Sequence, residues 1–527
     1  MRISIAIIIF FGSVSLYAQS VPLKLKWGKE FAAPRNSTVV DIIGYDHSGF
    51  YVLKNNARGS IFANNTFSIE RFDNNLNPAK SFELELTEGG KKSYLEFLLP
   101  LDGRLLLFTS FPDQKTKNNR LFVQPVDKQS LLADNNNKRQ LAEINYEGNS
   151  KKNSGSFSFR TSNDSSKVLI FYSLPYNYND PEKFGFMVVD KEMNLLWKKD
   201  ITLPYRDELF DIETIKVDNY GNAYVLGLLY MDRRRTKRKG AANYQYKVLS
   251  YTNNGGDINE YSVGLPDKFL TDLQIGIRAN KDIVCAGFYS ETGKLSIRGT
   301  FFFSIDARTK EVKTQSFKEF DIDFITQNMT EREADKAKRR EEKGQDVELY
   351  EYDLDKLIVR SDGGAMLIGE QYFVKTVTYT QYIGNRPSVR TVTYYYYNDI
   401  ILVNIDGSGN IDWAIKVPKR QMSVDDGGFY SSYAMAINKD KIYFIYNDNP
   451  DNLSYTGVGR VSNAGGRNQV VMVAQVNSKG EMSRKPLSAG ISEVIIRPKV
   501  CEQISYSDMI LFGQRRKTQQ FGRITFE

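Results

Sequence analysis

The chain has 527 residues, of which 41% are apolar and 13% aromatic, and its formal net charge at pH 7 is +8. Two cysteines in this length exclude a disulfide scaffold. A single histidine leaves almost no room for a His-based metal site or a Ser-His-Asp triad. The apolar content is enough for a large core, so the chain must fold by burial alone.

The N-terminus predicts a secretory signal peptide over residues 1–19. Arg2 precedes an apolar run from Ile3 to Leu16, and Ala18 offers a small residue for cleavage. No later segment approaches the roughly 18 apolar residues of a membrane span. We therefore expect an exported protein without a membrane span, periplasmic or extracellular and associated with the cell surface, with residues 20–527 forming one domain.

A unit of strand, acidic or glycine turn, and strand recurs at intervals of roughly 50 to 75 residues, the period of propeller blades with enlarged loops. Examples are VVDIIGYDHSGFYVLK, IETIKVDNYGNAYVLGLLY and YAMAINKDKIYFIYND. A second hairpin follows each unit, as in NDIILVNIDGSGNIDWAIKVP. The Asp-Gly and Asn-Gly turns supply the positive φ that tight hairpins need.

The repeat resembles β-propeller proteins across the whole mature chain, without the signatures of WD40, kelch or Asp-box sialidase repeats. It is similar to uncharacterised exported propellers with stretches such as NDIILVNIDGSGNIDW. The resemblance implies an all-β fold but no assigned function. We expect a single eight-bladed propeller, with seven blades as the alternative. The eight predicted blades are 39–88, 93–144, 155–203, 211–264, 272–318, 352–418, 431–488, and 491–527 completed by 22–32.

The three tryptophans predict how the ring closes. Trp197 and Trp413 each follow a polar turn in the last strand of a unit. Trp27 has the same surroundings but no preceding partner strand, and the last unit of the chain lacks a fourth strand. We therefore expect residues 22–32 to pair with the C-terminal strand, which removes two free sheet edges.

Two insertions depart from the repeat. Residues 319–351 predict a short polar surface helix, because Thr330 and Glu333 form a capping box and Gly344 follows as a stop. Residues 370–400 predict a long two-stranded hairpin, alternating Thr or Val with Tyr and turning at Gly384-Asn385.

We expect these insertions and the basic loop MDRRRTKRKG to lie on one face of the propeller, where variable loops on a rigid scaffold can bind a partner. The opposite turns are acidic or near neutral. The candidate binding residues are basic and aromatic side chains at the tips of this face: Lys115, Lys117, Arg120, Arg233, Arg234, Arg235, Lys237, Arg238, Lys239, Tyr379, Tyr382, Tyr394, Tyr396, Arg515 and Arg516.

The functional hypothesis is a non-catalytic binding or scaffold module for an anionic envelope polymer or an acidic protein. One alternative is a polysaccharide-active enzyme with carboxylates in the central funnel. Another is a structural subunit of an envelope complex, docked through the tyrosine-rich hairpin. A simpler interpretation is that the cations only keep hairpin tips soluble. No nucleic acid is expected as a partner, because base-stacking motifs are missing.

The sequence predicts no catalytic residue, cofactor or metal site. His47 lies in a turn, and Cys285 and Cys501 are too far apart in the repeat for a mutual bridge. The carboxylate clusters are more simply turn or helix-start residues. They are Asp425 with Asp426, Asp321 with Asp323, and Asp448 with Asp451.

Overall fold

The computed structural model describes residues 23–527 except 33–35, 58–65, 148–152, 177–178, 235–236, 239–240, 266–267, 294–295, 385, 466–467, 489–493 and 516. The signal peptide predicted for residues 1–19 lies outside the described residues.

The fold is all-β and antiparallel, and nearly every predicted unit corresponds to one sheet. The described residues contain six four-stranded sheets, one five-stranded sheet, one six-stranded sheet and three two-stranded ribbons. The first four large sheets comprise β3 (Ser37–Asp46), β4 (Gly49–Asn56), β5 (Thr66–Phe72) and β6 (Pro78–Glu83); β9 (Tyr94–Leu101), β10 (Arg104–Asp113), β11 (Asn118–Val126) and β12 (Arg139–Asn145); β13 (Ser156–Thr161), β14 (Lys167–Ser173), β15 (Pro181–Asp190) and β16 (Leu195–Arg206); and β17 (Phe210–Val217), β18 (Ala223–Tyr230), β21 (Tyr244–Thr252) and β22 (Asp257–Val263).

The second half of the chain continues the pattern. Its large sheets comprise β23 (Phe269–Ile277), β24 (Ile283–Ser290), β26 (Gly299–Ile305) and β27 (Val312–Glu319); β29 (Tyr352–Val359), β30 (Ala365–Ile383), β31 (Arg386–Ile405), β32 (Ile411–Val417) and β33 (Gln421–Val424); β34 (Ala434–Asn438), β35 (Lys441–Asp448), β36 (Val470–Val476) and β37 (Met482–Pro486); and β38 (Ile495–Ile496), β39 (Glu502–Gln503), β40 (Asp508–Arg515) and β41 (Thr518–Phe526) with β1 (Leu23–Trp27) and β2 (Phe31–Ala32). The short ribbons are β7 (Thr87–Glu88) with β8 (Lys91–Lys92), β19 (Lys237–Arg238) with β20 (Ala241–Ala242), and β25 (Ser296–Ile297) with β28 (Leu349–Tyr350).

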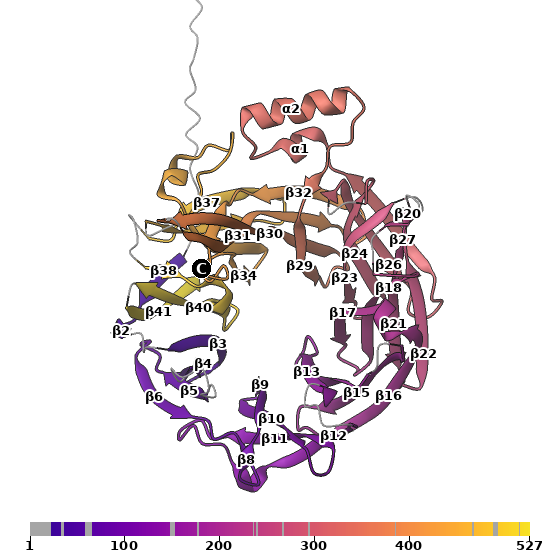
Figure 1. Ribbon diagram of the computed structural model, residues 1–527, viewed down its shortest axis with the longest axis vertical. Helices are drawn as coiled ribbons and strands as arrows, with labels where there is room; N and C mark the ends of the chain where they lie inside the picture. Colours follow the sequence, from indigo (N-terminus) through magenta and orange to yellow (C-terminus); the bar gives the residue numbers. More distant parts are fainter. Residues whose placement is uncertain are drawn as a thin grey trace, which may run out of the picture.

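The sheets follow one another in chain order around a central space (Figure 1). The first strands of successive sheets, such as β9, β13 and β29, lie nearest this space, and strands such as β6 and β22 lie outermost. Buried clusters fill the layers between neighbouring sheets. Leu169 and Val188 of one sheet, for example, share a cluster with Val225 and Leu249 of the next. Middle strands are therefore covered on both faces, and every residue of β24 is buried.

The N-terminal strand joins the C-terminal sheet. β1 pairs with β41 from Leu23 opposite Phe526 to Trp27 opposite Gly522, so residues from the two ends of the chain share one sheet. The Trp27 ring lies against Gly522, where a Cβ would come within 2.7 Å of it. The pairing predicted from the tryptophan pattern is present, because the last sheet offers a free edge with matching apolar alternation.

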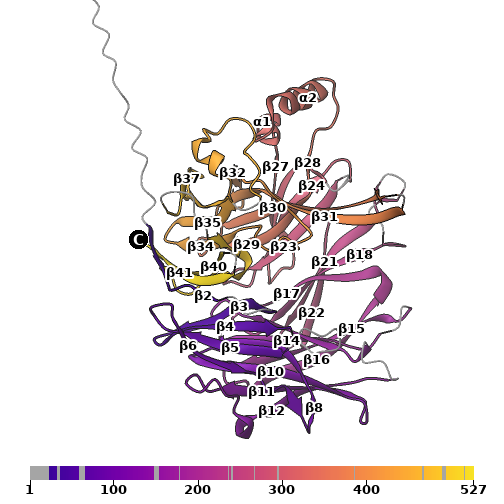
Figure 2. The same cartoon turned by 60° about the vertical axis from the view of Figure 1, so that its left-hand side comes forward.

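The insertion before β29 contains two helices where one was predicted. α1 spans Ile322–Thr326 and α2 spans Glu331–Glu342, with the predicted capping box between Thr330 and Glu333 and Gly344 at a φ of 70° after the end. The long hairpin is present as β30 and β31, which project beyond the rest of their sheet (Figure 2). We call residues 372–396 of this hairpin the flap.

Candidate functional site

The predicted basic tips are partly occupied by pairing within the molecule. Arg120 forms an ion pair with Asp113 at 3.4 Å and lies over the rings of Phe111 and Phe122. Arg234 pairs with Asp211 at 2.8 Å. Surface pairs of this kind contribute little stability, but each one removes a cation from the set that could bind a partner.

The remaining tip residues show no common patch among the described side chains. Arg515 lies 4.0 Å from Glu30, and Arg233 and Lys115 are exposed. Arg235, Lys239 and Arg516 lie outside the described residues, as do the side chains of Lys237 and Arg238 in β19. The strands that carry the tips, β11, β18 and β40, lie in different sectors around the central space (Figure 1). Joint action of these cations on one partner therefore stays a prediction.

The flap divides the predicted tyrosines between two faces. The register pairs Tyr396 with Phe373, Tyr394 with Lys375 and Tyr379 with Arg390. Because side chains alternate along a strand, Tyr379, Tyr394 and Tyr396 share one face and Tyr382 lies on the other. The Tyr396 ring stacks on Phe373 at 4.3 Å between centroids, so this tyrosine already has a partner within the flap.

The cations of the flap all lie on the face of Tyr379. Lys375, Arg386 and Arg390 have the register of that face, and residues 371–397 contain no Asp or Glu. The opposite face carries a threonine ladder, with Thr378 and Thr391 hydrogen-bonded at 3.1 Å, and the exposed side chains of Val374, Tyr382 and Val389. Tyr382 and Val389 are 73% and 69% exposed. The flap is thus a ribbon with one basic aromatic face and one apolar threonine face.

The carboxylate clusters singled out in the sequence have local structural roles. Asp321 caps the N-terminus of α1, and Asp323 pairs with Lys338 at 2.8 Å. Asp448 is fully buried and pairs with Arg484 at 2.7 Å. Asp425 and Asp426 accept hydrogen bonds from the backbone at Thr393 and Gly428. Asp451 follows the N-cap of a short 3-10 helix over Pro450–Ser454.

His47 is exposed in its turn, and both cysteines are buried and free. Across the described ranges, no group of three or more His, Cys, Asp or Glu side chains is placed to hold a metal ion. None of the described helices is long and apolar enough to cross a membrane.

Carboxylates that the sequence analysis missed recur on the innermost strands. Glu96, Glu213 and Asp355 are each skipped by the strand register and so occupy a β-bulge of β9, β17 and β29. Burial raises the pKa of all three, to about 6 for Asp355, which also accepts a hydrogen bond from Tyr433 at 2.6 Å. The sequence contains a pattern that could have revealed these carboxylates. Their segments Leu-Glu-Phe, Ile-Glu-Thr and Leu-Asp-Lys stand at equivalent places in the repeated units.

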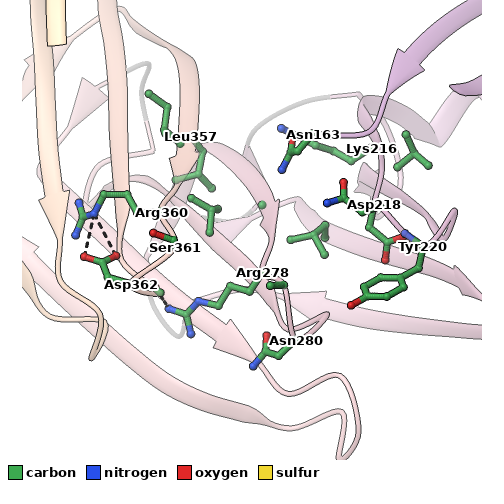
Figure 3. Close-up of a pocket in the computed structure, with 18 of the residues that line it drawn as sticks. Asn163, Lys216, Asp218, Tyr220, Arg278, Asn280, Leu357, Arg360, Ser361 and Asp362 are labelled. Carbon is green, nitrogen blue, oxygen red and sulfur yellow. Dashed lines mark hydrogen bonds and ion pairs between the residues drawn. The ribbon is translucent and has the colours of Figure 1, made fainter. Parts of the chain in front are cut away.

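A cavity lies at the turns opposite the flap-bearing loops. It has a volume of about 870 Å³ and is lined by turn residues of four successive sheets, at 163, 218–220, 279–280 and 361–363. Figure 3 shows Lys216 and Tyr220 on one side, Arg360 and Asp362 on the other, and Arg278 between them. Its size lies within the usual range of roughly 300–1,000 Å³ for ligand pockets.

The acidic side chains of this cavity are already used. Asp218 accepts hydrogen bonds from the backbone of Tyr220 and Asn222 and from the Tyr224 hydroxyl. Asp362 pairs with Arg360 at 3.2 Å. The sequence analysis described these turns as acidic or near neutral. Their carboxylates are engaged locally, Asp218 by hydrogen bonds and Asp362 by an ion pair, and Lys216, Arg278 and Arg360 lie beside them in the lining.

No protein-family model matches the chain, and no curated protein is significantly similar to it in sequence. Solved structures are similar only in fold. They include the WD40 domain of SCAP from fission yeast, with 9% identity, a TM-score of 0.38 and coverage of 96% of this chain and 94% of that one. A polysaccharide lyase of the ulvan lyase family PL25 has 10% identity, a TM-score of 0.36 and coverage of 87% and 96%. A protein of unknown function from Bacteroides caccae has 13% identity, a TM-score of 0.26 and coverage of 70% and 93%.

At these TM-scores none of the similarities carries an argument about function. The order and antiparallel pairing of the sheets define the class on their own: the chain is an all-β repeat protein of the propeller type.

Proposed function

We propose that the chain is an exported, eight-bladed propeller, closed through β1 and β41, that acts as a non-catalytic binding module for an acidic protein. The flap is its docking arm, and the partner adds an extended strand to the free edge of β30. The observation that carries the proposal is the flap itself, a projecting ribbon with three cations on one face and no carboxylate.

The edge of β30 is available for strand addition. Pairing with β29 ends at Gln371 opposite Tyr352, and the Tyr372 amide donates to the Glu351 carbonyl. From Phe373 to Ile383 the outer edge has no strand partner among the described residues. Over this length, about 35 Å at roughly 3.3 Å per residue, alternate amide and carbonyl groups face solvent. An added peptide gains main-chain hydrogen bonds there.

The other edge of the flap is covered at its base. β33 pairs with Tyr394 to Tyr397 of β31, and Asp425 continues this cover to Thr393. A partner strand therefore has one long free edge. Its side chains on the basic face would lie beside Lys375 and Tyr379 of β30, with Arg390 one strand further on in β31. Carboxylates in alternate positions fit that face, because opposite charges on neighbouring strands attract. An acidic protein suits the site better than a polysaccharide, which cannot pair with a sheet edge.

A defined peptide tests the proposal. We expect a fluorescent ten-residue peptide that alternates Glu with Val to bind the wild-type protein, with affinity that falls as salt increases. A peptide alternating Lys with Val is the charge control. A Glu-Val peptide with alternate amides N-methylated keeps the charge but cannot form the ladder. Both controls should bind at least about tenfold more weakly.

The matched protein variant shortens the flap. Replacing residues 378–391 by Asn-Gly keeps Val377 opposite Val392 as the last pair, so a two-residue turn can close the ribbon. We expect unchanged melting and loss of peptide binding. Equal binding of all three peptides, or full binding by the shortened variant, would show that the cations only guard a free edge against aggregation.

A further inference from the structure

The cavity at the turns continues into a second one. A neighbouring cavity of about 440 Å³ lies between the sheets of β17 and β23, and Tyr220 lines both. The Tyr220 side chain is 61% exposed, which is unusual for an aromatic ring in a turn. An oligomer that occupied both cavities would pass Tyr220, the residue that the two linings share.

Of the cations that line the two cavities, Arg360 pairs with Asp362, whereas no carboxylate among the described residues pairs with Lys216, Arg278 or Lys281. The same holds for Arg160, whose charge acts on Lys216. Arg160 donates to the Phe159 carbonyl, and Arg278 donates to the Ser304 hydroxyl and the Gly363 carbonyl. Lys281 lies 4.5 Å from the centroid of the Tyr220 ring. Lys216 has no hydrogen-bond acceptor in the described part of the chain. Nearby Asp282 and Asp306 both pair with Lys313, and Asp282 also accepts hydrogen bonds from the Asn280 side chain and the Ala307 amide.

The position of Lys216 is electrostatically unfavourable without a ligand. Burial in the cavity wall lowers the pKa of Lys216, and the neighbouring positive charge of Arg160 lowers it further. The Arg278 Nε is buried and has no hydrogen-bond acceptor. Like charges gathered at one cavity repel each other, and an anion placed among them would remove this repulsion.

The uncharged lining suits a sugar better than a bare anion. Amide side chains of Asn163, Asn219 and Asn280 offer both donors and acceptors, which hydroxyl groups can match in pairs. The second cavity adds Asn253 and Asn259 with the Tyr261 ring. An apolar ring beside several amides provides a surface for a sugar ring and polar groups that fix its orientation.

We propose that this double cavity binds an acidic oligosaccharide of the uronic-acid class, with carboxylates beside Lys216 and Lys281 and a sugar ring beside Tyr220. The site lies at the turns opposite the flap and does not depend on the flap's proposed role. Lys216 and Arg160 supply charge at one end, and the amides of the second cavity hold the hydroxyls at the other.

Calorimetric titration with tetragalacturonic acid tests this site. We expect the wild-type protein to bind it, and to bind its full methyl ester at least about tenfold more weakly, because the ester has the same rings without the charge. Inorganic phosphate at ten times the ligand concentration should not displace it. Displacement by phosphate would overturn the proposal in favour of a simple anion site, and equal binding of acid and ester would overturn the role of the cations.

The test variants remove charge or the ring. We expect Lys216→Met with Arg160→Gln to weaken binding of the acid at least about tenfold and to leave binding of the ester unchanged. Tyr220→Ala should weaken both ligands. Lys80→Met, on the exposed outer strand β6, is the control for removal of one surface charge away from the cavity and should bind like the wild type. The melting temperature of the double variant should not fall, which separates lost binding from lost folding. Wild-type affinity in the double variant, or no binding of the acid by the wild type, would refute the site.

Discussion

Asp272 of the inner strand β23 links folding stability to pH. Its carboxylate accepts a hydrogen bond from the Leu354 amide of the next sheet at 2.8 Å and from the Leu273 amide at 2.7 Å. Burial nevertheless raises the pKa of Asp272 from 3.8 to about 7, with further repulsion from Asp353 and Glu213. A raised pKa means that the folded state holds the proton more tightly than the unfolded state. The contribution of Asp272 to stability is therefore complete below about pH 4 and is lost as the pH rises through about 7.

The size of this effect follows from the two pKa values. A separation of about three pH units corresponds to at most about 4 kcal/mol, at about 1.36 kcal/mol per unit, and water in the central space will screen part of it. Asp272→Asn cannot ionise, so its stability relative to the wild type should rise between pH 4 and pH 8.5. The amide oxygen can still accept one of the two backbone hydrogen bonds, and losing the other costs about 1 kcal/mol at every pH.

Urea denaturation at pH 4, 5.5, 7 and 8.5 measures this difference. We expect Asp272→Asn to be less stable than the wild type at pH 4 and more stable at pH 8.5. Asp134→Asn is the control without pH dependence in this range. The Asn137 side chain lowers the pKa of Asp134 below 3.8 by hydrogen bonding, so this carboxyl group is ionised in the folded state from pH 4 to 8.5 and its stability difference should hardly change. A stability difference for Asp272→Asn that stays constant from pH 4 to 8.5 would refute the assignment of the raised pKa.

Three further outcomes test other parts of the structure. Deleting residues 20–33 should lower the melting temperature of the whole domain, whereas deleting only 20–22 should not, because β1 begins at Leu23. If the two deletions give equal melting curves in calorimetry, the β1–β41 pairing contributes nothing to stability. Lys419→Met should lower the free energy of unfolding measured in urea by about 3–5 kcal/mol, because it leaves Glu370 buried without its ion-pair partner. Adding Glu370→Leu should recover most of this loss. If it does not, the broken ion pair is not the cause of the destabilisation. A variant with reversed charges in the basic loop should melt like the wild type and bind the Glu-Val peptide more weakly at low salt, as measured by anisotropy. The reversed residues are Arg233, Arg234, Arg235, Lys237, Arg238 and Lys239. If this variant binds at wild-type strength and independently of salt, the loop only keeps the protein soluble.

Local patterns in the sequence predicted the elements well. The four strands β29 to β32 of one sheet run from Tyr352 to Val417, within a range predicted as 352–418, and only the short strand β33 of that sheet lies beyond it. Alternating apolar residues and Asp-Gly turns fix such strands independently of the rest of the chain. The Thr330–Glu333 capping box is formed for the same reason, since its partners are three residues apart. The small helix α1 was missed because it has too few residues to show a helical period.

Long-range contacts decide the site, and the sequence did not predict them. The flap's register was needed to show that Tyr382 lies apart from the other three tyrosines. The cavity depends on how turns as distant as Asn163 and Asp362 meet, and no local pattern contains that information. The ion pair of Arg234 with Asp211 joins the loop after β18 to strand β17 in the same way, so a count of cations in the loop overstated the free charge of the tip.

Paired and unpaired charges are distributed differently over the two surfaces that we propose as binding sites. Arg484 pairs with Asp448, and Arg120 pairs with Asp113. In the double cavity Arg360 pairs with Asp362, whereas no carboxylate among the described residues pairs with Lys216, Arg278 or Lys281, although Asp218 and Asp282 stand in the same turns. Those carboxylates are held by backbone amides and by Lys313, which fixes the turn shape and leaves the repulsion between Lys216 and Arg160 unrelieved. A rigid ring of sheets can maintain such a cost at one rim, because the buried layers between the sheets supply far more stability than a few like charges remove.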